Sequence, residues 1–576
     1  MGRIRLALAE RFKPAAPSWT QCDLANAKKL FNAEQLLYPS ALFSTMTYIK
    51  LIHETILHWS EVAPDSAALS CKADTLSYRQ LWLGVQQVAR GYRGLDLASG
   101  ERVAVYLPKQ PEAVIALYGA VAAGGVFVPI NPLLKPAQVA FILRDCNVRI
   151  LVTSADRASV LSDELSHCPD LRQVVTVDGP SGRGQVAHVP EVDWESLAKI
   201  GQASSAAARR IDADMAAILY TSGSSGHPKG VVLSHRNLVA AAQSAAESLD
   251  NCSADRILAV LPLSFDAGLV QVTSAFAVGA SVALIEYFFP NDVIKAVVRH
   301  SITGLAAVPP LWNKLSKMQW PEEARRSLRY ITNSGGAMPL AVLRALREQF
   351  PQTEIVLNYG LTEAFRSTCL RGDQVDIRPD SVGKPLPNVE IMVVRADGSL
   401  CSPGEPGELV HRGALVSLGY WNDRERTAEH FRPAPGQPQG ISNPEMAVWS
   451  GDQVRLDQEG YLYFISRKDE MIKTSGYRVS PTEVEEVAYA SGLVAEAAAI
   501  GVAHPVLEKG IVVVAVPKEA DGGHDLEARL LSHFREQLPS FMVPQRVIVS
   551  DVLELSANGK IDRKSLADRF QDVLIQ

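Results

Sequence analysis

The chain has 576 residues, 47% of them apolar and 21% charged, and its formal net charge is −6. This length is more than one hydrophobic core supports, and it predicts two to four domains. The small negative charge gives no electrostatic reason to expect binding to nucleic acid or to acidic membranes.

Cysteine and histidine usage argues against a zinc enzyme and a disulfide-rich secreted protein. The twelve histidines show no HExxH pattern and form no His/Cys cluster at metal-ligand spacing. The cysteines are far apart and form no CxxC pair, so we expect free thiols in a reducing compartment and a cytoplasmic protein. The seven are Cys22, Cys71, Cys146, Cys168, Cys252, Cys369 and Cys401.

Two apolar stretches bear on whether the chain is exported or crosses a membrane. Residues 6–9 are too few for the core of a signal peptide. The longest uncharged stretch, 113–134, has enough residues to cross a bilayer, but its glycines and prolines predict a helix, a glycine turn and a buried strand. We therefore expect no membrane span.

The predicted elements begin after residue 45. Residues 1–45 have mixed charge and no strong hydrophobic period, so an N-terminal extension is expected there, or else a start codon assigned too early. Strands and helices then alternate, which predicts βαβ units and a largely parallel sheet. The first strands are expected at 102–107, 126–130 and 148–152, and the first helices at 111–121 and 136–146.

Further along, the same alternation resumes and then changes character. Residues 178–190 and 201–213 are rich in Gly, Ser, Ala and Pro and predict surface loops. Short strands with Gly/Pro punctuation over 383–465 predict a β subdomain, and a smaller α/β block follows. We expect a large domain over 46–466 and a small one over 467–576. Strands are expected at 257–263, 281–286, 328–334, 497–502 and 511–516, and helices at 484–490 and 526–538.

The clearest motif is a loop between two apolar runs, 216–219 and 231–233. Glycines let backbone amides turn toward an anion, hydroxyl side chains add donors, and Lys229 adds charge, which together predict a polyphosphate cradle. It is not a Walker A loop, because Lys229 precedes Gly230 instead of following the motif's second glycine. A plain flexible loop is the alternative. The candidate residues are Thr221, Ser222, Gly223, Ser224, Ser225, Gly226 and Lys229.

Five other short motifs carry groups suited to a nucleotide. Asn358, Tyr359 and Gly360 follow an apolar strand and precede Thr362 and Glu363; the tyrosine offers a stacking face, the threonine a hydroxyl and the glutamate a carboxylate for Mg²⁺. The remaining candidates are an Asp suited to ribose hydroxyls, a glycine pair after a strand, a charged hairpin, and a lysine on a tight turn. They are Asp452, Gly335 with Gly336 and Ala337, residues 467–485, and Lys560.

The order of these motifs resembles the adenylate-forming superfamily of acyl-CoA synthetases, amino-acid adenylation domains and beetle luciferases. The resemblance covers residues 51–570 and six motifs in order. The runs 261–268 and 367–369 are similar to those of AMP-forming acyl-CoA ligases associated with bacterial exosortase and exopolysaccharide systems. The resemblance implies an α/β fold: a large N-terminal domain of stacked βαβ sheets with a β subdomain, and a small mobile α+β C-terminal domain.

The resemblance also implies a two-step reaction that uses ATP, Mg²⁺ and CoA. A carboxylic acid and ATP would give acyl-AMP and pyrophosphate, and a thiol would then displace AMP. The 221–229 loop would hold the β- and γ-phosphates, Glu363 would hold Mg²⁺, and Thr362 would lie near the α-phosphate. Residues 335–337 and 358–360 would enclose adenine. Asp452 and Arg467 would bind ribose, and Lys560 would bridge the carboxylate and the α-phosphate.

The same resemblance assigns the moving parts. Rotation of the small domain about Asp469 would remove Lys560 and bring Lys473 and Gly476 to the thiol tunnel. Two positions depart from the family pattern: Ser225 stands where threonine is usual, and Ser466 replaces a glycine before Arg467. Neither change removes a functional group.

Phe265 and Asp266 are the candidates for choosing the acid. Phe265 matches an aromatic gate, and an aspartate at the next position pairs with the substrate ammonium in amino-acid-activating relatives. Alternatively, Asp266 caps a helix or binds local backbone. Three functions therefore remain: an acyl-CoA ligase of fatty-acid type, a ligase loading an amino acid onto a carrier protein in trans, and a catalytically silent nucleotide-binding protein.

Overall fold

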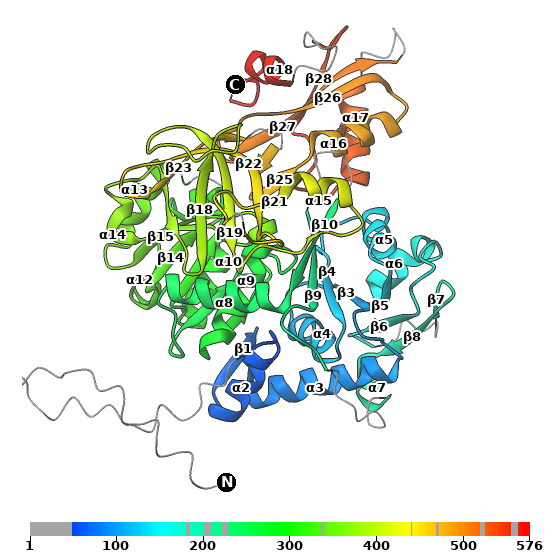
Figure 1. Ribbon diagram of the computed structural model, residues 1–576. Coiled ribbons are helices and arrows are strands. Elements are labelled where there is room, and N and C mark those ends of the chain that lie inside the picture. Colours follow the sequence, from blue (N-terminus) through cyan, green and yellow to red (C-terminus); the bar gives the residue numbers. More distant parts are fainter. Residues whose placement is uncertain are drawn as a thin grey trace, which may run out of the picture. The chain divides into compact units, whose positions relative to one another are not determined.

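The computed structural model describes residues 49–179, 185–200, 209–221, 228–335, 338, 340–438, 440–467, 472–518, 525–554 and 563–575. It is the α/β fold predicted from the sequence, with helices packed on the faces of two large sheets (Figure 1). The expected extension, residues 1–45, lies outside the described residues.

A nine-stranded sheet occupies the first part of the fold, in the order β20-β10-β9-β4-β3-β5-β6-β8-β7. The strands from β9 through β8 in this order are parallel, whereas β10 pairs antiparallel with β9, and β20 with β10. The bounds are β3 Arg102–Tyr106, β4 Val126–Pro129, β5 Val148–Thr153, β6 Gln173–Thr176, β7 Gln185–Val186, β8 Val189–Asp193, β9 Met215–Thr221, β10 Lys229–Ser234 and β20 Gly419–Tyr420.

A fourteen-stranded sheet follows, in the order β18-β19-β22-β23-β17-β16-β15-β14-β13-β11-β12-β1-β2, with β21 paired to β22. Its strands are parallel from β1 through β15 and antiparallel from β16 onward, where the predicted β subdomain joins. The bounds are β1 Ala67–Cys71, β2 Asp74–Ser77, β11 Arg256–Ala259, β12 Ser281–Leu284, β13 Gly304–Ala307, β14 Tyr330–Asn333, β15 Glu354–Tyr359, β16 Thr368–Leu370, β17 Ser381–Pro385, β18 Val389–Val394, β19 Gly407–Gly413, β21 Phe431–Pro433, β22 Met446–Leu456 and β23 Leu462–Arg467.

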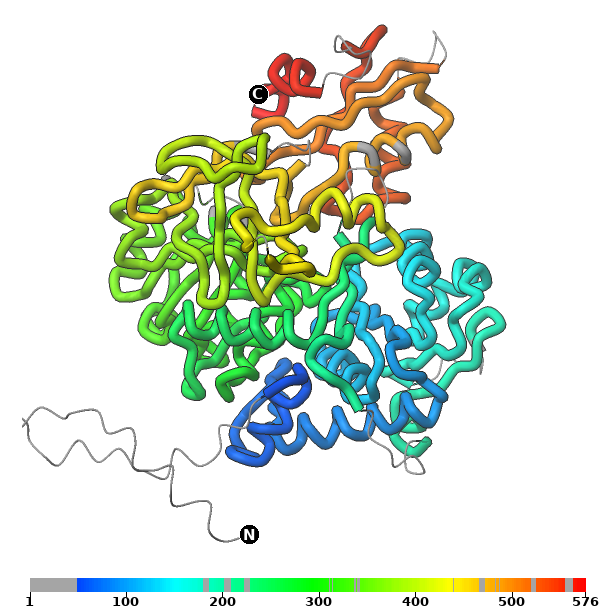
Figure 2. Tube along the Cα trace, viewed as in Figure 1, coloured from blue at the N-terminus to red at the C-terminus, as the bar shows by residue number. Residues whose placement is uncertain are grey.

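The helices form layers on both sides of these sheets, as Figures 1 and 2 show. Alternate strand residues point to opposite faces, so Val103 and Val105 of β3 join one core cluster while Ala104 and Tyr106 join another. The first cluster lies between the two sheets and contains α3, α4, α8 and α9. The bounds are α2 Glu54–Val62, α3 Tyr78–Gly94, α4 Pro111–Ala122, α5 Pro136–Asp145, α6 Ala155–Leu165, α7 Trp194–Ile200, α8 His235–Ser248, α9 Asp266–Val278, α10 Pro290–Arg299, α11 Pro309–Leu315, α12 Glu322–Ser327, α13 Leu340–Gln349, α14 Gly372–Val375 and α15 Arg424–His430.

The C-terminal block has its own cores. A three-stranded sheet in the order β26-β27-β28 packs against helices, and a short hairpin, β24-β25, precedes it. The bounds are β24 Ile472–Thr474, β25 Tyr477–Val479, α16 Pro481–Ala490, β26 Val494–Ala503, β27 Lys509–Pro517, α17 Leu526–Gln537, β28 Arg546–Val549 and α18 Arg563–Arg569. The predicted α/β pattern of this block is confirmed.

Helix α8 starts directly after β10, and its start is fixed by a capping box. The Ser234 hydroxyl accepts from the Asn237 amide, and the Asn237 side chain accepts from the Ser234 amide in return. Asn237 Nδ2 also donates to the carbonyls of Ala414 and Val416, at 2.9 and 2.7 Å. This one side chain therefore attaches the loop before β20 to the start of α8.

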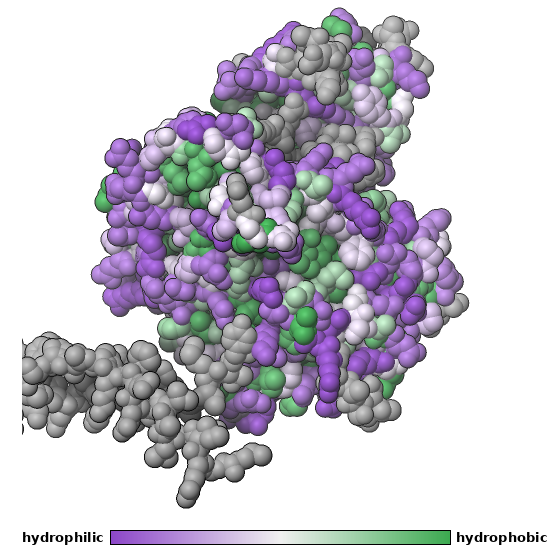
Figure 3. All heavy atoms as spheres, in the orientation of Figure 1, coloured by the Kyte–Doolittle hydropathy of each residue, from purple (hydrophilic) through white to green (hydrophobic). Residues whose placement is uncertain are grey.

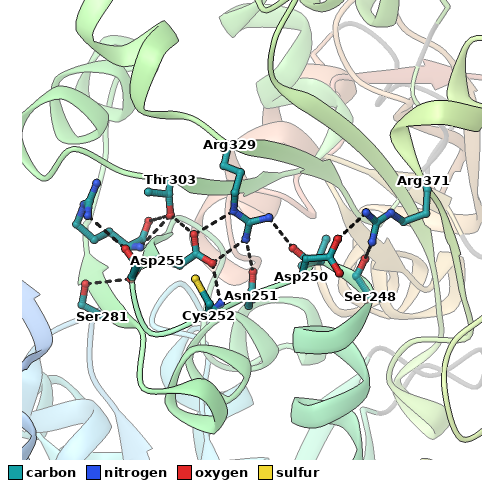
Figure 4. Close-up of polar contacts among 12 residues, drawn as sticks. Ser248, Asp250, Asn251, Cys252, Asp255, Ser281, Thr303, Arg329 and Arg371 are labelled. Atoms are coloured by element: carbon teal, nitrogen blue, oxygen red, sulfur yellow. Dashed lines mark hydrogen bonds and ion pairs between the residues drawn. The ribbon is translucent and has the colours of Figure 1, made fainter. Parts of the chain in front are cut away.

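A polar network fixes the amino ends of three strands of the large sheet (Figure 4). Arg329 donates to Asp255 at 2.7 Å and to the Leu249 carbonyl at 2.9 Å, and the Thr303 hydroxyl donates to Asp255 at 2.7 Å. Burial alone would raise the pKa of the Asp255 carboxyl, but Arg329 and Thr303 hold it below its ordinary value. The loop after α8 is thus joined to β11, β13 and β14.

Two sequence-based expectations can be compared directly with this fold. Residues 178–190 were expected to be a loop, but Gln185–Val186 and the start of β8 lie there; Val186 and Val189 are buried and β8 extends the sheet beside β6, so burial outweighed the local composition. The stretch 113–134 is helix α4, a turn at Gly124 (φ +89°) and strand β4. No helix in the described ranges is long and apolar enough to cross a membrane, and polar side chains cover much of the face in Figure 3.

Candidate active site

The predicted phosphate loop joins the neighbouring antiparallel strands β9 and β10 of the nine-stranded sheet. Thr221 ends β9 and Lys229 starts β10, and the two residues face each other in the antiparallel register. The Thr221 hydroxyl oxygen is buried and has no hydrogen-bond partner within the described residues. The intervening candidates Ser222, Gly223, Ser224, Ser225 and Gly226 lie outside that part of the chain.

Lys229 and Glu363 form an ion pair between the two large sheets. Lys229 Nζ lies 3.0 Å from Glu363 Oε1, and both groups are largely buried. Tyr420, on β20, donates its hydroxyl to the same carboxylate oxygen at 2.6 Å, while Lys229 Nζ donates to the Tyr420 oxygen at 3.0 Å. The lysine also lies 4.5 Å from the centre of the tyrosine ring.

This arrangement keeps Glu363 ionised. Burial alone would raise the pKa of its carboxyl group, but the Lys229 ammonium, the Tyr420 hydroxyl and the Arg478 guanidinium hold that pKa well below its ordinary value. Glu363 is therefore a carboxylate over the whole physiological pH range. The backbone also fixes it, because the Glu363 carbonyl accepts from the Ser417 amide at 2.8 Å.

A cavity of about 570 Å³ brings together most of the predicted site residues that the structure describes. They come from the ends of β9, β14 and β15, from the start of α9 and from the hairpin β24-β25, which are more than 250 residues apart in the chain at the extremes. The predicted residues that line the cavity are Thr221, Phe265, Asp266, Gly335, Asn358, Tyr359, Gly360, Thr362, Lys473 and Gly476.

One wall of this cavity is joined to the β subdomain through Tyr359. The Tyr359 hydroxyl donates to Asp452, whose side chain is buried in β22 and whose amide donates to Ser450 at 3.0 Å. Arg467 faces Asp452 in the β22–β23 register, although its side chain is not among those described. Asn358 donates to Thr332, while its Oδ1 atom is buried with no partner in the described part.

Asp266 is the first residue of α9, and Phe265 is the N-cap, so Asp266 is not a capping residue. Its carboxyl group accepts from the Ala267 amide, as the local-backbone alternative predicts, and it also lines the cavity. Burial raises the pKa of this carboxyl from 3.8 to about 6, against the opposing effects of the Ala267 amide, Arg478 and Arg366. The side chain therefore both contacts local backbone and presents a titratable group to the cavity.

The hairpin β24-β25 contributes the opposite wall. Tyr477 meets Phe265 edge to face, with ring centres 5.1 Å apart, and stacks on Phe541 at 3.7 Å. Gly476 has φ +80°, and a Cβ atom there would lie 2.4 Å from Val308 Cγ1. Only glycine therefore fits where the hairpin approaches the strand ends.

Besides the five loop residues named above, four more predicted residues lie outside the described residues: Gly336, Ala337, Asp469 and Lys560. The sequence reasoning also missed three residues of the site, namely Tyr420, Tyr477 and Arg366. Arg366 could have been predicted from the sequence, since it is a charged residue directly after the apolar Phe365 and three positions after Glu363. Tyr420 and Tyr477 carried none, because their roles depend on contacts distant in sequence.

Comparison with known proteins defines the class. Residues 56–421 match the model of the AMP-binding enzyme family, and residues 483–560 match that of the AMP-binding enzyme C-terminal domain. The chain belongs to the AMP-binding enzyme family, which confirms the predicted adenylate-forming superfamily. The likeness to ligases of exosortase systems stays a prediction.

Individual relatives agree with this assignment. The chain is 32% identical over 508 residues to an L-proline--[L-prolyl-carrier protein] ligase of Streptomyces coelicolor, covering 86% of this chain and 92% of the relative. It is 28% identical over 534 residues to tyrocidine synthase 3 of Brevibacillus parabrevis, covering 90% of this chain but 8% of that protein. The chain thus spans about a tenth of the length of such large synthases. A solved o-succinylbenzoate CoA synthetase of Bacillus subtilis shares the fold with a TM-score of 0.75 and 26% identity, covering 89% of this chain and 98% of that one.

The buried ion pair gives a first prediction. Lys229→Met leaves the Glu363 charge without its main partner and destabilises the protein by about 3 kcal/mol. Adding Glu363→Gln removes that charge, so the double variant recovers a large part of the loss. Thermal unfolding of the wild type, both single variants and the double variant measures the coupling. Additive effects would mean that the two side chains do not interact.

The raised pKa of Asp266 gives a second prediction. Because the folded-state pKa (about 6) exceeds the ordinary value of 3.8, the folded protein binds more protons in this window, and ionisation of Asp266 lowers stability as the pH rises through it. Asp266→Asn removes a cost on the order of 1–3 kcal/mol above pH 6. The unfolding midpoint of the variant should exceed that of the wild type by roughly 1–5 °C at pH 8. The gap should close toward pH 4; a gap that is constant with pH would contradict this origin.

Proposed function

We propose that the protein is an AMP-forming acid–thiol ligase. It activates a carboxylic acid with ATP to give acyl-AMP and pyrophosphate, and then transfers the acyl group to a thiol, for which CoA is the first candidate. The observation that carries the proposal is one cavity lined by part of the candidate nucleotide residues, among them Thr221, Tyr359 and Thr362, together with the candidate acid residues and the β24-β25 hairpin. Such a space lets the acid, the α-phosphate and the thiol meet at one point.

The nucleotide side of the cavity has polar atoms suited to ATP. Thr221 has a buried hydroxyl and Asn358 a buried amide oxygen, each lacking a partner in the described residues, and such atoms are costly unless a ligand supplies the hydrogen bond. Tyr359 lines the same side and offers a ring face to adenine. Asp452, bonded to Tyr359, lies where it can accept from ribose hydroxyls.

Glu363 is the residue that would hold Mg²⁺. In the described part no three His, Cys, Asp or Glu residues form a metal cluster, which fits an ion that takes one or two carboxylates and completes its shell with phosphate oxygens and water. The carboxylate is ionised, and one of its oxygens is engaged by Lys229 and Tyr420. Bound there, Mg²⁺ would neutralise phosphate charge.

The chain's own residues then perform the adenylation step. The acid carboxylate attacks the α-phosphorus, a bond forms between carboxylate oxygen and phosphorus, and pyrophosphate leaves with the bonding electrons. Lys229 and the amides of the 221–229 loop would stabilise the departing charge, and the Thr362 hydroxyl would contact the α-phosphate. Lys560 would bridge the two reacting anions before the small domain moves.

In the second step a thiol attacks the acyl carbon and AMP leaves. Lys473, Ser475 and Gly476 line the cavity together with the candidate acid residues, so the hairpin is placed to form part of the thiol's path. Gly335 supports this arrangement, since a Cβ atom there would lie 3.4 Å from the Gly476 carbonyl oxygen. A cytoplasmic location is a further part of the proposal.

A second candidate is a ligase that activates an amino acid and loads it onto a carrier protein. The carboxyl of Asp266 in the cavity favours it, because a buried carboxylate is suited to an ammonium group. The carrier-protein ligase named above adds support. Both candidates share the adenylation step and differ in the acid and in the thiol.

The deciding experiment is ATP–pyrophosphate exchange over panels of fatty, aryl and amino acids. We expect exchange with at least one class of acid. Exchange with amino acids that Asp266→Ala abolishes would select the carrier-protein candidate, whereas exchange with fatty or aryl acids that survives this change would select the first. No exchange with any acid would leave a silent nucleotide-binding protein.

Two variants separate the half-reactions. Lys560→Ala should slow adenylation by about 100–1000-fold and spare thioester formation from supplied acyl-AMP. Gly476→Ala should do the reverse, because its Cβ atom would collide with Val308 in the described arrangement of the hairpin. Equal loss of both half-reactions in either variant would contradict the assigned role. Gly492→Ala, at a positive φ with open space around it, controls for backbone strain.

A further inference from the structure

Arg366 is a buried cation at the wall of the cavity. Its residue is 8% exposed, and its Nη1 atom is buried without a hydrogen-bond partner in the described part of the chain. No ion pair joins it to a carboxylate of the described residues. A guanidinium remains charged at all accessible pH values and carries five N–H donors, so leaving it unpaired in the interior is costly.

The backbone holds this side chain in a fixed place. Phe365, just before it, has φ +55° and ψ −87°, a conformation that non-glycine residues rarely adopt. A Cβ atom on Gly360 would lie 2.2 Å from the Phe365 carbonyl oxygen and 2.8 Å from Arg366 Cα, so the turn after β15 packs directly on this segment. Beyond it, the Ser367 amide donates to the Tyr359 carbonyl at 2.8 Å. The strained backbone at Phe365 and the close packing on both sides of Arg366 indicate that the fold holds this side chain in a fixed position.

Asp266 is the carboxylate that acts electrostatically on Arg366, and it is not a direct partner. Arg366 and Asp266 influence each other electrostatically and line the same cavity, but no ion pair or hydrogen bond joins them among the described contacts. An ion pair would have kept the Asp266 carboxyl strongly acidic, whereas burial raises its pKa to about 6. Arg366 therefore retains donors for a ligand.

We propose that Arg366 binds a second carboxylate on the acid, so that the substrate class is dicarboxylic acids. The inference rests on the proposed function, and it names the substrate of that same site. The reacting carboxylate lies toward Thr362 and the nucleotide, and the second carboxylate completes the hydrogen bonding of the guanidinium, which is suited to planar, bidentate carboxylate binding. Where the acid also carries an ammonium group, Asp266 lies in the same cavity to accept it.

The test compares acids of equal length with one or two carboxylates: butyrate with succinate, hexanoate with adipate, and norvaline with glutamate. ATP–pyrophosphate exchange gives kcat/KM for each member of a pair. We expect the wild type to favour the dicarboxylate in at least one pair, and Arg366→Met to lower that ratio by about 10–100-fold, as expected for a lost hydrogen-bonded charge. Arg366→Lys should give an intermediate ratio. Arg371→Met removes an ion-paired arginine that does not line the cavity, and it should leave the ratio unchanged.

Thermal unfolding with the free acids provides a readout that does not need catalysis. The preferred dicarboxylate should raise the midpoint of the wild type and not that of Arg366→Met. This shift without any exchange would uphold the inference and reject the proposed function. If exchange occurs but no pair favours the dicarboxylate, the inference is rejected and the proposed function stands. The same holds if the preference for the dicarboxylate survives in Arg366→Met. The unfolding midpoint of Arg366→Met could also fall and be restored by adding Asp266→Asn. That result would make Arg366 a structural partner of Asp266 and would also reject the inference.

Discussion

The ion pair between Lys229 and Glu363 joins the two large sheets at the point where their strands end. Lys229 begins β10, the second strand from one edge of the nine-stranded sheet, and Glu363 follows the last parallel strand of the fourteen-stranded one. Tyr420 closes the group by contacting both. Because these three side chains compensate one another, a carboxylate and an ammonium can persist in a largely buried place. Thr221, which pairs with Lys229 across the strands, and Thr362, next to Glu363, both line the cavity, so the ion pair ties together two segments of its wall.

Much of the fold was readable because it follows from local pattern. Alternating apolar runs and helical periods gave the βαβ units, and strands such as β3 and β5 end within about one residue of their expected positions. The order and spacing of the motifs predicted the family and several of the polar residues that line the cavity. Each of these features depends on a short contiguous segment of the sequence.

The parts of the fold and of the candidate site that could not be predicted depend on contacts between segments distant in sequence. Tyr420 is a strand residue in sequence, and only the pairing of β20 with β10 brings it to Glu363. Residues 185–190 look like a loop by composition, but the edge of β6 offers a hydrogen-bonding ladder to β8 that composition does not reveal. Of the two alternatives for Asp266, the contact with local backbone is present, and the pairing with a substrate ammonium stays a prediction for a carboxyl group that also lines the cavity.

The aromatic contact between Phe265 and Tyr477 has a consequence for the modular use of this fold. Tyr477 and Phe541 come from the C-terminal block, yet they line the same cavity as Phe265 and Asp266. Exchanging the C-terminal block between homologues therefore also replaces part of the wall of this cavity. A chimera joined at the segment after Arg467 would have a cavity whose walls come from both parents and match neither.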